Sequence, residues 1–437
     1  MTKVTEIITN LKFFLTSKLT KETYRMDSED FSRTGKIGFK NAVLLMGSQM
    51  RGSLDFDLYK ILDSNDLESI SKSAYSQCRY KIKAELYKDW NVVLLDNVYG
   101  KKGTDLGILN LKKYKGYYID AIDGSKLTLP NTELMKENFG VQLGGSKKTQ
   151  SETAMCLLMC SYDVLNHYYI KTAVSHLEVG ENTVVKSWVQ ELRSDAITLF
   201  DRGFPSFFLF SLLNKYEKPY VMRVKVSFNQ QVKAFVSSGK TEEIVTMISS
   251  KKECFEKETV EKGDSICVRL IRVELSTGEV EVLVSNLMDE TLFKVADFKE
   301  LYGLRWGVET SYDTLKNKFL LTCFSGQKVA AIYQDIYATI FVHNLYSIIS
   351  NEAQVVVDEK FKHRKYEYSI NKSVSIAIYK EKIMTIFISE EPDIIVQKLV
   401  DLFLKYTEPI RPNRHYKRKK SINKRRNLFT QNNYKRN

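Results

Sequence analysis

The sequence predicts a mixed α/β fold, with a helical segment before a sheet-containing core and a basic tail after it. Residues 1 to about 95 have apolar side chains at helical spacing and short connections. From about residue 115, short apolar strands alternate with helices. The chain has 437 residues, 43% of them hydrophobic, which allows roughly two to four domains with cores of their own.

Within the helical segment, residues 68–87 contain a predicted helix whose outer side is basic. Its candidate N-cap is Ser71 or Ser73, and apolar side chains follow at helical spacing, namely Tyr75, Cys78, Ile82 and Leu86. The other faces carry Arg79, Lys81 and Lys83. Such a helix suits a DNA groove or backbone. An ordinary amphipathic surface helix fits the same pattern, because no clear helix-turn-helix consensus is present.

The core begins with a strand in residues 116–130 that we expect to end at Asp123-Gly124. Residues 153–176 predict two apolar strands around a turn, and a helix follows from about Asn182. The next strand, AITLF, is closed by Asp201-Arg202-Gly203, after which Pro205 opens a helix. Strand, hairpin, helix, strand and helix in this order indicate a mixed α/β core.

Residues 219–295 alternate with period two and predict a β-rich insertion, with a hairpin turn at residues 276–279. Further helices are expected over residues 297–319, 327–350 and 391–405. The expected organisation is a helical DNA-binding domain (1–95), a core in two parts (110–218 and 296–350) separated by the insertion (219–295), a helical C-terminal region (351–410) and a disordered basic tail (411–437).

Composition argues against several classes of protein. Near the N-terminus, basic residues are not followed by the unbroken apolar run that a secretory signal peptide needs. The most apolar helical stretch, residues 330–350, contains polar residues and therefore predicts a core helix rather than a membrane span. The six cysteines show no CxxC spacing and the five histidines are scattered, so we expect reduced thiols and no zinc site. The expected location is the cytoplasm, in association with the nucleoid, and any metal must be held by carboxylates.

Most of the net charge of +13 lies in the C-terminal tail, where residues 411–437 contain eleven Lys or Arg and no acid. Such a run buries too little apolar surface to fold alone, and nucleic acid is its natural partner. The candidate contacts to double-stranded DNA are Arg411, Arg414, Lys417 and Arg418. A solubilising or non-specific tail is the alternative interpretation.

The stretch YGLRWGVETSYDTLK, residues 302–316, gathers charged and phenolic side chains on one face of a helix. Separations of three, four, three and four bring five side chains into a stripe roughly 80° wide, namely Tyr302, Arg305, Glu309, Tyr312 and Lys316. A solvated salt-bridge face is the simplest interpretation. Apolar residues on the other sides of the helix favour a cleft wall instead.

Three acids stand where chemistry rather than packing explains them. Asp123 and Asp201 each follow an apolar strand near a glycine, and Glu309 lies on the stripe. Each Asp taken alone also fits a turn or strand-end cap. Together the three predict a site for two hard divalent ions roughly 3.5–4 Å apart, suited to phosphodiester chemistry. Asp120 competes with Asp123, but their odd separation puts them on opposite faces, and Gly124 favours Asp123.

The stripe resembles a known signature. The Y-(2)-R-(3)-E-(6)-K pattern of bacterial insertion-sequence DDE transposases of the type-four group is matched by Tyr302, Arg305, Glu309 and Lys316. The segments Asp123-Gly124-Ser125 and Asp201-Arg202-Gly203-Phe204 resemble the first and second motifs of this family, in the right order. Both termini are also similar to those of the family, so the likeness covers nearly the whole chain.

This resemblance implies an RNase H-like core in which Asp123, Asp201 and Glu309 bind two Mg²⁺ ions, with Mn²⁺ as a substitute. It implies a transposase that binds the terminal inverted repeats of an insertion sequence, cleaves DNA in a metal-dependent step and transfers the strands, with a hairpin intermediate. The residues expected to bind phosphates near the cut are Tyr302, Arg305 and Lys316. A homodimer is expected in the synaptic complex.

One feature departs from the family's pattern. Relatives that form hairpins are expected to hold a flipped base with an aromatic side chain, often Trp, from the insertion. The tryptophans of this chain all lie outside residues 219–295, at Trp90, Trp188 and Trp306, and the possible substitutes are Phe228, Phe235 and Phe255. Two other functions stay open: an RNase H-like DNA nuclease without strand transfer, and a catalytically silent DNA-binding derivative.

Overall fold

The computed structural model describes residues 3–33, 35–48, 50, 52–101, 107–144, 151–255, 257–274 and 278–411. The chain divides into two compact units. We call them the sheet unit (Lys112–Lys126 and Leu157–Tyr312) and the helical unit (Met1–Leu111, Leu127–Cys156 and Asp313–Asn437). The finer domain boundaries expected from the sequence stay predictions. In the described ranges, no helix is long and apolar enough to cross a membrane.

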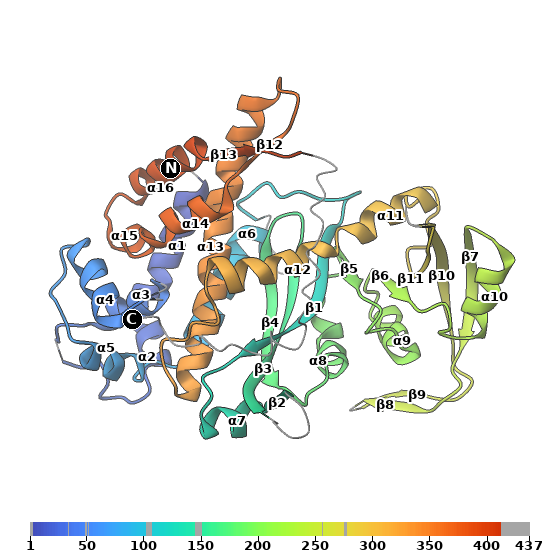
Figure 1. The fold of residues 1–437 in the computed structure, drawn as a ribbon, viewed down its shortest axis with the longest axis horizontal. Helices are drawn as coiled ribbons and strands as arrows, with labels where there is room; N and C mark the ends of the chain where they lie inside the picture. Colours follow the sequence, from blue (N-terminus) through green and yellow to red (C-terminus); the bar gives the residue numbers. More distant parts are fainter. Residues whose placement is uncertain are drawn as a thin grey trace. The chain divides into compact units, whose positions relative to one another are not determined.

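A mixed sheet forms the centre of the sheet unit (Figure 1). Its strands follow the order β3-β1-β5-β6-β11-β10-β7, and β4 also pairs with β3. Their bounds are β1 (Tyr118–Thr128), β3 (Ser151–Asp163), β4 (Tyr168–His176), β5 (Ala196–Phe200), β6 (Tyr220–Val224), β7 (Glu242–Ile248), β10 (Ser265–Glu274) and β11 (Val280–Ser285). The mixed α/β class predicted from the sequence is confirmed.

Strand direction changes along the sheet. β5 is parallel to both β1 and β6, whereas β11 is antiparallel to β6, and β10 is antiparallel to β11 and β7. The strands predicted for a separate β-rich insertion therefore extend the sheet that contains β1 and β5. The expected hairpin of β10 and β11 is present, although the first residues of its turn, 275–277, lie outside the described ranges.

Two helices, α8 (Glu181–Trp188) and α9 (Phe207–Lys215), contribute to the core of the sheet unit. Apolar side chains from both helices, from β1 and from β5 form one buried cluster, which includes Ile122, Trp188, Phe200 and Leu209. Ser206 caps α9, because its Oγ accepts a hydrogen bond of 3.1 Å from the amide N–H of Leu209. Pro205 therefore precedes the cap and does not open the helix.

The remaining elements of the sheet unit are one helix and a two-stranded ladder. Helix α10 (Gln230–Ser238) begins at the cap Asn229, whose Oδ1 accepts from the amide N–H of Val232 at 2.8 Å, and it ends at Gly239. Gly239 has φ +73°, the left-handed conformation that closes helices at little cost only for glycine. A two-stranded ladder of β8 (Glu253–Phe255) and β9 (Glu258–Val260) completes this region.

The long helix predicted over residues 297–319 is divided into three pieces. Helix α11 (Val295–Gly303) ends before Leu304, α12 (Trp306–Asp313) follows, and a π-helical turn η2 (Thr314–Lys318) comes last. A π-turn adds residues to each turn of the helix, so side chains after Asp313 leave the stripe drawn for one regular helix. The expectation of a single face from residue 302 to residue 316 is therefore wrong at its C-terminal end.

The helical unit contains helices from both ends of the chain and the short strand β2. Their bounds are α1 (Lys3–Thr16), α2 (Lys18–Tyr24), α3 (Phe39–Gly47), α4 (Leu54–Asp63), α5 (Lys72–Arg79), α6 (Glu85–Tyr99), α7 (Glu133–Phe139), β2 (Val141–Gly144), α13 (Val329–Phe361), β12 (Tyr368–Ile370), α14 (Lys372–Lys380), α15 (Ile383–Ile388), α16 (Pro392–Lys405) and β13 (Thr407–Pro409). The ring of Trp90 stacks on that of Phe341 with centroids 4.1 Å apart, which joins α6 to α13.

Candidate active site

Asp123 lies on β1, just past the part of that strand that pairs with β5. The parallel ladder joins Tyr118 to Ala196 and Ala121 to Leu199. β1 continues beyond Asp123 to Thr128, so the expectation that this strand ends at Asp123-Gly124 is wrong. The carboxylate is half-buried, and its Oδ1 accepts a hydrogen bond of 2.9 Å from the amide N–H of Gly124.

Asp201 follows the last residue of β5, and the register of the sheet brings it beside Asp123. Because the ladder pairs Ala121 with Leu199, the same offset makes Asp123 level with Asp201. Residues at the same level of adjacent parallel strands face the same side of the sheet, with backbones about 4.8 Å apart. Asp201 Oδ1 accepts a hydrogen bond of 2.7 Å from the amide N–H of Gly203, which holds the turn that follows the strand.

The surroundings of Asp123 make it a weaker acid than an ordinary aspartate. The pKa of Asp123 is raised to about 6, chiefly by burial and further by the negative charges of Glu181 and Asp201, although the Gly124 hydrogen bond and the Arg305 charge lower it. The pKa of Glu181 is also raised, first by burial and then by Asp201. Three acids are thus close enough to repel one another, and a bound cation would relieve this repulsion.

Helix α12 is fixed against β1 by a tyrosine hydroxyl. The Tyr312 Oη donates to the backbone carbonyl oxygens of Asp123, at 2.8 Å, and Leu158, at 3.0 Å. The aromatic side chain is 5% exposed, so both hydrogen bonds lie inside the protein. Sequence analysis placed Tyr312 on the charged stripe; the structure shows that this residue anchors the helix that carries Glu309.

Glu309 and Arg305 pair with each other one helical turn apart. Arg305 Nη2 donates to Glu309 Oε1 at 2.8 Å; the Glu309 side chain is 39% exposed and the Arg305 side chain 9%. The Nε of Arg305 is a buried donor without a hydrogen-bond partner among the described residues. A buried guanidinium with an unused donor suits an anion such as a phosphate.

Tyr302 is another predicted site residue on the sheet unit. The pKa of Tyr302 is raised to about 12, chiefly by burial; the charges of Arg305 and Arg223 lower it, and those of Asp201 and Glu281 raise it. Arg223 follows from the register, because β5 pairs Phe200 with Met222 and the same offset makes Asp201 level with Arg223. Arg223 Nη1 lies 2.7 Å from Glu281 Oε1.

The described residues include no group of three or more His, Cys, Asp or Glu side chains already arranged to hold a metal ion. The donors still fit a hard divalent cation, because Asp123, Asp201 and Glu181 are mutually repelling carboxylates and Glu309 lies on a helix anchored at Asp123. Glu309 has one of its oxygens bound to Arg305. The roles of the three predicted acids as metal ligands stay predictions.

The predicted DNA contacts lie in several places. Lys316 is half-buried on the turn η2 and belongs to the helical unit. Lys81 and Lys83 are exposed; Lys81 Nζ lies 3.3 Å from Asp30 Oδ1, and Lys83 Nζ donates to the carbonyl oxygen of Thr23 at 2.8 Å. Arg411 is exposed, and three predicted contacts lie outside the described residues, namely Arg414, Lys417 and Arg418.

The expectation that Arg79 lies on the outer side of its helix is wrong. Arg79 is 1% exposed; it donates to Gln334 Oε1 at 2.9 Å and to Asp335 Oδ1 at 3.1 Å, and it also donates to Ser325. A buried guanidinium needs such partners because an unpaired charge is costly in the interior. The polar residues Gln334 and Asp335, inside an otherwise apolar helix, were the sequence signal for a buried cation.

Two residues near the acids were not found by sequence reasoning. Arg223 becomes visible only when the β5–β6 register is known, because nothing in its local sequence separates it from other strand residues. Glu181 begins α8 and resembles any acid that stabilises a helix N-terminus. Its proximity to Asp123 and Asp201 arises from the packing of α8 in the core, which no local pattern encodes.

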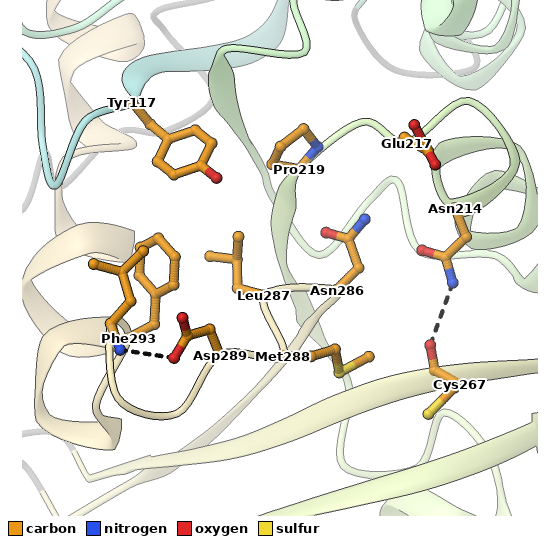
Figure 2. Close-up of a pocket in the computed structure, with 11 residues that line it drawn as sticks. Tyr117, Asn214, Glu217, Pro219, Cys267, Asn286, Leu287, Met288, Asp289 and Phe293 are labelled. Carbon is orange, nitrogen blue, oxygen red and sulfur yellow. Dashed lines mark hydrogen bonds between the residues drawn. The ribbon is translucent and has the colours of Figure 1, made fainter.

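A separate cavity of about 530 Å³ lies in the sheet unit (Figure 2). It contains none of the predicted site residues. Two of its polar side chains, Asn286 and Asp289, have several partners, whereas the buried Asn214 Oδ1 has none among the described residues. Asn286 Oδ1 accepts from the amide N–H of Tyr220, and its Nδ2 donates to the carbonyl oxygen of Lys218. Asp289 accepts from the amide N–H groups of Thr291 and Leu292. The cavity therefore offers no group of converging catalytic side chains.

Comparison with known families identifies the class of protein. The family model "Transposase DDE domain" matches residues 114–345, which is more than half of the chain, so the chain belongs to this family. The matched range includes β1, β5 and α12, and thus all three predicted acids.

Individual relatives are more distant. The transposase InsG for insertion sequence element IS4 of Escherichia coli (strain K12) is 22% identical over 234 residues, which are 53% of this chain and 51% of that protein. The chain thus spans about half the length of this curated relative. Among solved structures, the piggyBac transposase synaptic complex with hairpin DNA matches with a TM-score of 0.46 and 12% identity, over 91% of this chain and 85% of that one.

Proposed function

We propose that the protein is a cut-and-paste DNA transposase, which binds the terminal inverted repeats of an insertion sequence, cleaves the DNA there and joins the freed ends to a target. One observation carries the proposal: Asp123 and Asp201 each lie two residues beyond Ala121 and Leu199, the last paired residues of two adjacent parallel strands, and Tyr312 anchors the helix of Glu309 at the backbone of Asp123. The strand order, with β5 parallel to β1 and β6, supports an RNase H-like core.

Asp123, Asp201 and Glu309 are the residues that would hold divalent ions, with Mg²⁺ as the expected species and Mn²⁺ as a substitute. Bound there, two such ions supply activation of an attacking oxygen and stabilisation of a leaving oxygen at a phosphodiester. The residues themselves set the geometry, because the sheet register fixes the two aspartates while the Tyr312 hydrogen bonds fix α12. Glu309 must release Arg305 Nη2 to turn its carboxylate toward the aspartates.

The basic and phenolic residues of the signature bind the DNA backbone in this proposal. Arg305, once released by Glu309, has an unused Nε and a free Nη2 that match two phosphate oxygens. Tyr302 keeps its hydroxyl proton at neutral pH, because its pKa is raised to about 12, and can donate it to a phosphate. Lys316, on the helical unit, stays a predicted phosphate contact.

The hairpin intermediate and strand transfer are the finer part of the proposal. Of the three phenylalanines that were candidates to hold a flipped base, Phe235 is 1% exposed and packs in the core, which leaves the partly buried Phe228 and Phe255. The partners are double-stranded DNA at the transposon ends and at the target. A homodimer, with one protomer on each transposon end, is the expected synaptic assembly.

The test uses a supercoiled plasmid that carries the inverted repeats flanking the gene, incubated with purified protein and Mg²⁺. Wild type is expected to release the element, to give hairpin ends on a denaturing gel and to join those ends to a second plasmid. Glu309→Gln and Asp123→Asn are expected to lower cleavage by at least about 100-fold, because each removes a carboxylate required at the reacting phosphate.

Glu300→Gln is the matched control, since it removes the same charge from an exposed position of the preceding helix and should cleave like wild type. Equal cleavage by wild type and Glu309→Gln would overturn the catalytic assignment. Cleavage without hairpins or joined products would instead favour an RNase H-like nuclease. Retention of DNA without cleavage in any divalent metal would favour the silent DNA-binding derivative.

A further inference from the structure

The backbone at Gly124 is in direct contact with an acidic side chain from another element. A Cβ built on Gly124 would overlap Glu181 Oε1, would lie 2.7 Å from Glu181 Cδ and 2.8 Å from Met159 Sδ. Real Cβ atoms do not approach other heavy atoms so closely. Glycine at this position therefore makes the space that the Glu181 carboxylate occupies, immediately after Asp123 in the chain.

The position of Glu181 is fixed by the packing of its helix. Glu181 is the first residue of α8, whose buried residues Val184, Val185 and Trp188 belong to the core of the sheet unit. The next residue, Asn182, donates from Nδ2 to the carbonyl oxygen of Gly203 at 3.0 Å. That hydrogen bond ties the start of α8 to the turn that follows Asp201.

A second helix shows what an acid at this position does when it only stabilises a helix. Glu133 is the first residue of α7; its side chain is 79% exposed and lies 2.8 Å from Lys136 on its own helix. Glu181, by contrast, is half-buried and directed at the backbone of Gly124. Stabilisation of the helix terminus requires no such direction.

The charges near this group are unbalanced. Asp123, Asp201 and Glu181 repel one another. Arg305 acts on Asp123 and Lys126 on Glu181, while Arg223, which the register brings near Asp201, is paired with Glu281. Arg305 is itself paired with a fourth acid, Glu309. A divalent cation at Asp123 and Asp201 would relieve this repulsion, and an acid next to the ligands strengthens such binding by its charge.

We propose that Glu181 is a fourth acidic residue of the active site, admitted by Gly124, which increases the affinity of the Asp123–Asp201 pair for a divalent cation. The inference rests on the proposed function, because it concerns the cation of that same site. It assigns Glu181 the role of a positioning residue, which acts on the cation through the two aspartates.

The direct test is a binding titration of the full-length protein with Mn²⁺, in which free Mn²⁺ is measured by electron paramagnetic resonance. Glu181→Gln is expected to weaken the binding that Asp123→Asn and Asp201→Asn abolish, by about 10- to 100-fold. Glu178→Gln is the matched control, because it removes the same charge three residues away from a side chain that is 90% exposed. It should bind Mn²⁺ like wild type.

Thermal unfolding in a chelator separates this role from a purely structural one. Loss of a mutually repelling carboxylate should raise the melting temperature of metal-free Glu181→Gln above that of wild type, whereas loss of a helix-stabilising acid should lower it. Addition of Mg²⁺ should then stabilise the variant less than wild type. A lower melting temperature in chelator with unchanged Mn²⁺ affinity would overturn the proposal.

Gly124→Ala tests the same idea without a change of charge. The new methyl group must displace the flexible Glu181 side chain, and Met159 with it, so this variant should also weaken Mn²⁺ binding. The double variant Gly124→Ala/Glu181→Gln should bind no more weakly than Glu181→Gln, because the displaced group is already neutral. Additive losses would mean that Gly124 acts independently of Glu181 and would overturn the inference.

Failure of the inference and failure of the proposed function give different results. If wild type binds Mn²⁺ through Asp123 and Asp201 and cleaves DNA, while Glu181→Gln binds Mn²⁺ equally well, only the role of Glu181 is lost. If wild type neither binds Mn²⁺ through the two aspartates nor cleaves, both conclusions fall.

Discussion

At the scale of single residues, Asp123 is the carboxylate of the site whose negative charge is made unfavourable by burial and by neighbouring acids. Its carboxylate is mostly buried, accepts one backbone hydrogen bond and faces two other acids. A carboxylate in such surroundings gains a proton more readily in the folded than in the unfolded chain. The free energy of unfolding of the metal-free protein therefore depends on pH through this residue.

The sign of this dependence follows from the raised pKa, which is about 6 against an ordinary value of 3.8. Between these values the folded protein binds more protons than the unfolded chain, so stability falls as pH rises through that range. We expect metal-free Asp123→Asn to be more stable than wild type at pH 7.5, on the order of 2 kcal/mol. The difference in stability should become small near pH 3.5, where Asp123 is protonated in the folded protein and mostly protonated in the unfolded chain.

Urea unfolding at the two pH values, in the presence of a chelator, measures this difference. Asp313→Asn, at an exposed acid of α12, serves as the control and should show little change at either pH. A variant Asp123→Asn that is less stable than wild type at pH 7.5 would contradict the described environment of Asp123.

Tyr312 is the residue whose loss should separate α12 from β1. Tyr312→Phe removes the donor shared by the carbonyl oxygens of Asp123 and Leu158, and with it both hydrogen bonds inside the protein. We expect the free energy of unfolding to fall by about 1–3 kcal/mol, and cleavage to fall because Glu309 loses its fixed position. Urea unfolding and the plasmid assay measure the two effects.

The control for Tyr312→Phe is Tyr220→Phe. Tyr220 is also fully buried in the sheet unit, but its hydroxyl has no hydrogen-bond partner among the described residues. Removal of an unsatisfied buried hydroxyl should leave the protein equally stable or more stable. Equal losses in both variants would show that the Tyr312 hydrogen bonds contribute nothing.

At the scale of helices and strands, local sequence explains the elements themselves better than their connections. Ser71, one of the two predicted caps, accepts the expected hydrogen bond, whereas α9 begins after the cap Ser206 and not at Pro205. The break between α11 and α12 falls at Gly303, a residue type common at helix ends, although residues 297–319 contain no proline and keep helical spacing. The π-turn after Asp313 has no such local signal. Tertiary contacts such as those of Tyr312 decide where that helix changes its winding.

Helix α5 illustrates how a long-range ion pair changes the interpretation of a basic residue. Arg79 joins α5 to α13 through Asp335, whose side chain is 5% exposed. Arg79→Ala leaves that carboxylate buried without its cation, and we expect the free energy of unfolding to fall by about 3–5 kcal/mol. Affinity for DNA at moderate temperature should keep the salt dependence of wild type, because Arg79 is not exposed to phosphates.

Lys83→Ala is the comparison for this prediction, since Lys83 is exposed on the neighbouring segment. It should change stability by less than about 0.5 kcal/mol. If Lys83 contacts DNA as predicted, this variant lowers the salt slope of binding by about one. Thermal unfolding and fluorescence anisotropy with a labelled duplex distinguish the two variants; a stable Arg79→Ala with reduced salt slope would restore the original prediction for Arg79.

At the scale of the whole molecule, the candidate acids come from short sequence patterns, whereas their neighbours in space do not. Asp123, Asp201 and Glu309 were selected from short patterns, and the matched family range contains all three. Glu181, Arg223 and the continuation of the sheet through β6, β11 and β10 depend on strand register and helix packing over long sequence distances. Such contacts leave no periodic signal in a single sequence.

The basic tail is the remaining part of the molecule for which charge alone supports a prediction. Residues 411–437 contain eleven Lys or Arg. Each of these side chains that contacts a phosphate releases counterions from the DNA when the protein binds. Deletion of this segment should weaken binding to any duplex and flatten the dependence of log K on log salt by about one per lost contact. Anisotropy titrations from low to high salt measure both quantities.

A shuffled tail provides the control, because it keeps the composition of residues 411–437 and changes their order. If the tail acts through charge, the shuffled protein binds like wild type on every duplex, with the same salt slope. If it recognises the inverted repeats, the shuffled protein loses only its preference for them. If the deletion leaves the salt slope of binding unchanged, the tail makes no phosphate contacts. DNA binding would then depend on exposed Lys and Arg side chains elsewhere in the chain.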